Sequence, residues 1–140
     1  MKLSIRNQLD ATIESVDAGP AMTTVRALIN GGHLITAAIT TEAGTDLQLH
    51  AGSPIRVLIK STEVSVALDP VGRISIRNSL PGTIVAVDHG EVMSTVKIDL
   101  GSDQVLTAAI TKASAEELDL EVGVPVTALI KATNVAVWVP

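Results

Sequence analysis

Polar side chains suited to holding a small anion recur at matching positions in the two halves of this 140-residue chain. The tetrapeptide Ser4-Ile5-Arg6-Asn7 returns unchanged as Ser75-Ile76-Arg77-Asn78, 71 residues later. The shared set offers hydroxyl, amide and cationic donors and contains no carboxylate. A small oxyanion needs such converging donors, with enough positive charge to offset its own. The shared positions are Ser4, Arg6, Asn7, Thr40, Lys60 and Thr62, with their counterparts Ser75, Arg77, Asn78, Thr111, Lys131 and Thr133.

Each of these residues also has an ordinary structural interpretation when it is taken alone. Arginine and lysine are common at solvated strand ends, and asparagine is a frequent turn former. The binding interpretation is therefore favoured only by their joint recurrence in both halves.

Other kinds of chemistry find little support in the sequence. The histidines His33, His50 and His89 have no histidine partner in the other half, so a metal site is not indicated. The absence of cysteine excludes disulfides, thiolate ligands and a cysteine nucleophile. No phosphate-binding loop, nucleophile elbow or recurring pair of carboxylates is present. A binding protein without enzymatic activity is the resulting interpretation.

The two halves are copies of one another and predict two domains. A shift of 71 residues aligns positions 4–69 with positions 75–140 without a gap, and about 28 of the 66 pairs are identical. We therefore expect residues 1–70 and 71–140 to form one domain each. The segment Asp69-Pro70-Val71-Gly72 would join them.

Composition limits how well such small units can stand alone. The chain has no Phe, no Tyr and one Trp, although 46% of its residues are hydrophobic and its mean hydropathy is +0.42. Aliphatic side chains must fill the cores, so we expect the units to pack on each other and on further chains. A net charge of −5 argues against nucleic-acid and membrane partners. No apolar signal or membrane segment is evident, and a cytoplasmic location is expected.

Hydrophobic periodicity predicts an all-β fold with one short helix in each half. Period-two alternation, as in residues 96–100, indicates strands. Residues 113–120 have helical character, with Thr111 or Ser114 as the N-cap. Five to six short strands with a late helix favour a small Greek-key barrel of the OB type in each half, with a β-sandwich as the alternative. The other strands are expected at 12–16, 34–40, 55–60, 63–68, 83–87, 105–111, 126–131 and 134–139.

Three motifs, each present twice, resemble those of the Mop domain. They are Ser-x-Arg-Asn near the start of each half, Thr-Ala-Ala-Ile-Thr before the helix, and Leu-Ile-Lys-(Ser/Ala)-Thr-x-Val near the end. Over residues 2–69 and 73–139 the chain is similar to di-Mop molbindins, which consist of two such domains. The resemblance implies OB-like barrels, a homotrimer, and binding of molybdate, with tungstate as an analogue, at interfaces between domains. It also implies storage or buffering of the oxyanion and no enzymatic activity.

The resemblance further implies which residues contact the oxyanion. Ser61 of the first half is replaced by Ala132 in the second, whereas Ala43 is replaced by Ser114, so the halves would offer hydroxyl donors at different positions. The implied residues are Ser4, Arg6, Asn7, Thr40, Ala43, Gly44, Lys60 and Ser61, together with Ser75, Arg77, Asn78, Thr111, Ser114, Ala115, Lys131 and Ala132.

The competing hypothesis is an oligomeric OB-type module that binds single-stranded nucleic acid or another partner. Such modules use aromatic stacking platforms and a basic groove. One aromatic residue and an excess of acidic residues make this the weaker hypothesis.

Overall fold

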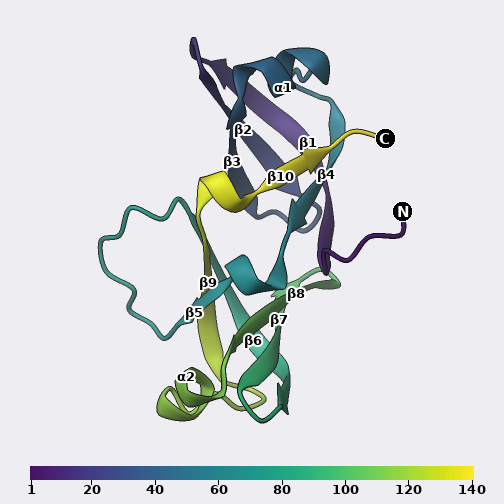
Figure 1. Ribbon diagram of the computed structural model, residues 1–140. Coiled ribbons are helices and arrows are strands. Elements are labelled where there is room, and N and C mark those ends of the chain that lie inside the picture. The colour runs from purple at the N-terminus through teal and green to yellow at the C-terminus, as the bar shows by residue number, and fades with distance from the viewer.

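The computed structural model describes all 140 residues and contains two five-stranded antiparallel sheets. Each sheet forms a small barrel with one short helix, and the helices lie at opposite ends of the molecule (Figure 1). The prediction of an all-β fold with two small tandem barrels is confirmed. The first repeat supplies β1 (Asn7–Ala18), β2 (Met22–Ile29), β3 (Leu34–Thr40), α1 (Thr41–Asp46), β4 (Pro54–Ile59), the 3-10 turn η1 (Ser61–Glu63) and β5 (Ser65–Ala67). The second supplies β6 (Asn78–His89), β7 (Met93–Gly101), β8 (Gln104–Thr111), α2 (Lys112–Glu117), β9 (Pro125–Ile130), η2 (Ala132–Asn134) and β10 (Ala136–Trp138).

Alternating burial along the strands produces the core. Every second residue of β2 and of β7 is buried, so each strand turns one face inward. Burying one aliphatic side chain contributes about 1.5–3 kcal/mol. A single continuous cluster of 25 buried apolar residues draws on both repeats, which explains how small units without aromatic anchors are stabilised. The largest fully buried side chains are Ile13, Ile29, Ile35, Ile59, Ile84, Ile98, Leu106 and Ile130.

Each barrel takes one edge strand from the other repeat. The sheet orders are β10-β4-β1-β2-β3 and β5-β9-β6-β7-β8, so β5 joins the second barrel and β10 joins the first. In Figure 1 the yellow β10 lies along the upper barrel and the teal β5 along the lower one. The boundary at residue 70 therefore separates the two sequence repeats, but each sheet contains strands from both sides of that boundary. The chain passes from one barrel to the other at the turns η1 and η2. The strands expected at 63–68 and 134–139 therefore begin later than predicted, because their first residues belong to these turns.

A row of three side chains fastens β10 to the first barrel. Arg56 on β4 lies opposite Asp10 on β1 and opposite Trp138 on β10. Its Nε donates to Asp10 Oδ1 at 3.0 Å, and its guanidinium carbon lies 5.2 Å from the centre of the Trp138 ring. Cross-strand and cation–π pairs of this kind contribute roughly 0.5–1 kcal/mol each. The second barrel has Thr127 at the position of Arg56, and its hydroxyl donates to Asp69 at 2.8 Å.

Both helices begin at a threonine. The Oγ1 atoms of Thr40 and Thr111 accept hydrogen bonds from the backbone N–H groups of Ala43 and Ser114. Thr111 is therefore the N-cap, as the sequence predicts, and α2 starts and ends earlier than the expected 113–120 because it begins directly after this cap. No helix in the structure has the length and the apolar character needed to cross a bilayer.

The strand exchange predicts that a single repeat is not folded as a monomer, because its barrel lacks one edge strand. A chain of residues 1–70 should show little β-structure by circular dichroism unless it dimerises, with two copies exchanging β5. Equimolar fragments 1–70 and 71–140 should recover β-structure and elute as a 1:1 complex in size exclusion with light scattering. A stably folded monomer of residues 1–70 would contradict the prediction.

Candidate functional site

Two segments of the second repeat that are far apart in sequence meet in one groove. The groove has a volume of about 240 Å³ and contains two cations and two hydroxyls but no carboxylate. It unites four of the residues predicted to contact an oxyanion, and we call it the Arg77–Lys131 groove. Its lining consists of Ser75, Ile76, Arg77, Lys131, Ala132 and Thr133.

Strand pairing explains why these segments meet. Strand β6 begins one residue after Arg77, and β9 ends one residue before Lys131. The two strands are antiparallel, with these ends opposite each other, so both cations lie at the same end of the sheet. The pairing of β1 with β4 places Arg6 and Lys60 of the first repeat in the same way.

Both arginines fold back on the segment that precedes them. Arg77 donates from Nε to the carbonyl of Ser75 at 3.3 Å and from a terminal nitrogen to the carbonyl of Ile74 at 3.2 Å. Arg6 makes the same two bonds, two and three residues back, at 3.3 and 2.9 Å. These bonds hold each segment in a loop and leave other guanidinium N–H groups to bind a ligand.

The four cations of these segments are available to a ligand. Arg6, Lys60, Arg77 and Lys131 are exposed, and none forms an ion pair with a carboxylate. Positive charge that is not held in an ion pair attracts anions. The groove lining has no carboxylate and no histidine, and its two cations and two hydroxyls are groups that bind an anion.

The side chains of Asn7 and Asn78 have a different role from the predicted one. Both residues are buried, at 2% exposure. Asn7 Nδ2 donates to the carbonyl of Thr107 at 2.8 Å, and its Oδ1 accepts from the Thr107 N–H at 2.7 Å. Asn78 makes the same two bonds with Thr36, also at 2.8 and 2.7 Å. Each side-chain amide therefore joins one repeat to the other and is not free to bind an anion.

The predicted residues at the helices lie away from the groove. The helices stand at the two ends of the molecule, whereas η1 and η2, which directly follow Lys60 and Lys131, lie where the barrels meet (Figure 1). Thr111 caps α2 and also donates to Ser114 Oγ at 2.7 Å. One chain therefore does not bring the two groups of predicted residues together. The group at the helices is Thr40, Ala43, Gly44, Thr111, Ser114 and Ala115.

Comparison with known proteins connects this arrangement to a family. A family model described as the TOBE domain matches residues 3–66 and again residues 74–137. The chain belongs to the TOBE-domain family. Molybdenum-pterin-binding protein MopA of Rhodobacter capsulatus is 39% identical over 142 residues, which cover 100% of this chain and 53% of MopA. A probable molybdenum-pterin-binding protein of Haemophilus influenzae is 45% identical over 67 residues, which cover 48% of this chain and 97% of that protein.

A solved structure matches both TOBE repeats at once. The cytoplasmic molybdate-binding protein ModG, in a form with molybdate bound, matches with a TM-score of 0.97 and 35% identity over 100% of both chains. The resemblance to tandem Mop-domain proteins is confirmed by these matches. The chain spans about half the length of MopA.

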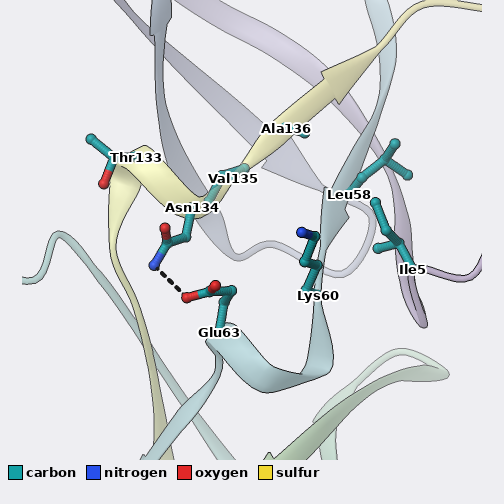
Figure 2. A pocket seen from close by; sticks show the side chains of 8 residues that line it. All are labelled: Ile5, Leu58, Lys60, Glu63, Thr133, Asn134, Val135 and Ala136. Atoms are coloured by element: carbon teal, nitrogen blue, oxygen red, sulfur yellow. Dashed lines mark hydrogen bonds between the residues drawn. The ribbon is translucent and has the colours of Figure 1, made fainter.

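Two further cavities lie where the TOBE repeats meet, and they are related by the repeat. One has a volume of about 220 Å³ and includes Lys60, and the other has about 210 Å³ and includes Lys131. Glu63 and Asn134 line both of these central cavities, and Asn134 Nδ2 donates to Glu63 Oε2 at 2.9 Å (Figure 2). The sequence alone does not reveal this pair, because Glu63 and Asn134 differ in type and neither belongs to a repeated motif position.

The buried asparagine bonds give a direct prediction: Asn7→Asp should lower the free energy of unfolding by about 2–4 kcal/mol. The second carboxylate oxygen would face the Thr107 carbonyl in place of a donor, and a charge would be buried. Chemical denaturation measures the change. Asn30→Asp, in an exposed turn, is the matched control and should change stability by less than about 0.5 kcal/mol. Equal effects of the two substitutions would contradict the assigned role.

Proposed function

We propose that this protein binds molybdate reversibly, with tungstate as an analogue, and stores or buffers it without altering it chemically. The Arg77–Lys131 groove carries the proposal, because it gathers cations and hydroxyl donors without a carboxylate. The relatives support it: ModG, which matches the chain from end to end, is a molybdate-binding protein solved with molybdate bound.

The groups in the groove have separate tasks. Arg77 and Lys131 supply positive charge, whereas Ser75 and backbone N–H groups supply directed hydrogen bonds. The first repeat offers Ser61 where the second has Ala132, and a hydrogen bond to a charged group contributes about 1.5–3 kcal/mol. The sites of the two repeats therefore differ in affinity. The first repeat offers the equivalent set Ser4, Arg6, Lys60 and Ser61.

A complete site requires a second copy of the chain. The predicted segments 40–44 and 111–115 lie at the ends of the molecule, so they reach a groove only if it belongs to another chain. Exposed apolar side chains stand beside these segments, with Met22 at 47%, Met93 at 44% and Val92 at 72% exposure. A homotrimer, as the family resemblance implies, would cover these side chains and bring a helix of one chain to the groove of the next.

The protein is proposed to act in the cytoplasm as a store or buffer of molybdate and not as a catalyst. ModG is described as cytoplasmic and molybdate-binding, which supports both points. Binding of single-stranded nucleic acid is disfavoured by the net charge of −5 and by the single aromatic residue, since such binding relies on a basic groove and stacked aromatics.

The proposal predicts that molybdate and tungstate raise the melting temperature, whereas sulfate and phosphate at equal ionic strength raise it much less. A ligand that binds only the folded protein stabilises it by about 2.7 kcal/mol at 100 times its Kd. Donors at fixed positions satisfy the larger tetrahedral anion better than the smaller one, which gives the selectivity. A thermal-shift series measures the order, and no shift with either molybdate or tungstate would contradict the proposal.

A matched pair of variants connects the thermal shift to the groove. Lys131→Ala should reduce the molybdate shift, because it removes a cation from the groove. Lys97→Ala removes the same charge from an exposed position of β7 and should leave the shift unchanged. Equal losses in both variants would show that net charge, and not the groove, is responsible.

A further inference from the structure

The contact between Glu63 and Asn134 joins equivalent positions of the two TOBE repeats. The residues are 71 apart in sequence, the spacing of the repeat, and they bond at 2.9 Å. A contact between equivalent positions must lie on the approximate two-fold axis that relates the repeats. The first repeat has a carboxylate at this position and the second has an amide. The two repeats therefore differ in residue type at the axis that relates them.

Glu63 faces both central cavities. It lines the cavity that includes Lys60 and the cavity that includes Lys131. Figure 2 shows its carboxylate directed at Asn134 and not at Lys60, and it forms no ion pair with either lysine. Its negative charge therefore acts in both cavities. The Arg77–Lys131 groove, in contrast, contains no carboxylate.

We propose that Glu63 is a specificity-determining residue that keeps free anions out of the two central cavities. This inference rests on the proposed function, since it concerns which cationic cavity the oxyanion occupies. Apart from Glu63, each central cavity presents a lysine, a threonine hydroxyl and the Asn134 amide, a donor set close to that of the groove. The carboxylate repels a dianion that enters either cavity. The anion is thereby directed to the groove, whose own lining has two cations and no carboxylate, although Lys131 lines both the groove and a central cavity.

The pairing with Asn134 fits this role. The amide donates to Glu63 Oε2 and holds the carboxylate at the axis, where it is shared by the two cavities. Two glutamates at these positions would repel each other, and two asparagines would supply no charge. One acid and one amide therefore give a single negative charge with a fixed position.

The test is molybdate binding by Glu63→Gln, measured by equilibrium dialysis at low ionic strength with metal analysis of the protein fraction. The glutamine carbonyl can still accept from Asn134, so the contact at the axis is kept. The variant should bind additional molybdate in a weak class of sites. The apparent molybdate affinity of these sites should be roughly three- to tenfold higher in the variant than in the wild type. The gain should shrink as salt approaches about 0.15 M, because Glu63 is exposed to solvent.

Two controls separate position from net charge. Glu14→Gln makes the same charge change at an exposed position of β1 that lines neither cavity, and it should bind like the wild type. The double variant Glu63→Asn, Asn134→Glu keeps both the net charge and the hydrogen bond, and it too should lack the weak class of sites.

The outcomes distinguish this inference from the function on which it rests. Wild-type binding together with an unchanged Glu63→Gln isotherm would overturn the role of Glu63 alone. An equal gain in Glu14→Gln would overturn it as well, because the effect would then follow net charge. The absence of molybdate binding by the wild type and by every variant would overturn both the proposed function and the inference.

Discussion

The reciprocal exchange of β5 and β10 is the constraint on which the rest of the structure depends. Neither sheet is complete until both repeats are in place, so the barrels must meet where the chain crosses from one to the other. Asn7 and Asn78 occupy this meeting point, and each supplies the donor and the acceptor that a neighbouring strand would supply. Because buried backbone groups must find partners, these four bonds hold the two barrels in one arrangement.

The same crossing positions the candidate binding groups. Each Ser-x-Arg segment directly precedes a buried asparagine, which is the first residue of β1 or β6. Each lysine directly follows β4 or β9, the strand that pairs with β1 or β6 respectively. The bonds between the barrels therefore fix the backbone segments that carry the cations, without involving the cationic side chains themselves. Binding groups held in advance lose less conformational entropy when a ligand arrives, which favours affinity. In the proposed assembly, the exposed helices at the far ends would offer polar groups to the groove of a neighbouring chain.

Much of this organisation could be predicted from the sequence. Alternating hydrophobicity and the repeated motifs indicate the strands and the helix capped by Thr111, and the motifs also supply the residues that we propose contact the oxyanion. The strand exchange could not be predicted, because residues 65–67 and 136–138 have the same alternation whichever barrel they join. The burial of Asn7 depends on a contact with Thr107, 100 residues away, so no local pattern reveals it. The proposed role of Glu63 was not predicted either, because it depends on the difference between Glu63 and its counterpart Asn134, whereas repeated motifs reveal only what the two halves share.

The most direct test of the account is the position of molybdenum in crystals grown with molybdate, located by anomalous diffraction near the molybdenum absorption edge. We expect peaks beside Arg77 and Lys131 and beside Arg6 and Lys60, each completed by the helix segment of a neighbouring chain. The central cavities that Glu63 lines should be empty. Molybdenum in those cavities, or bound within one chain away from the Arg–Lys segments, would contradict the account.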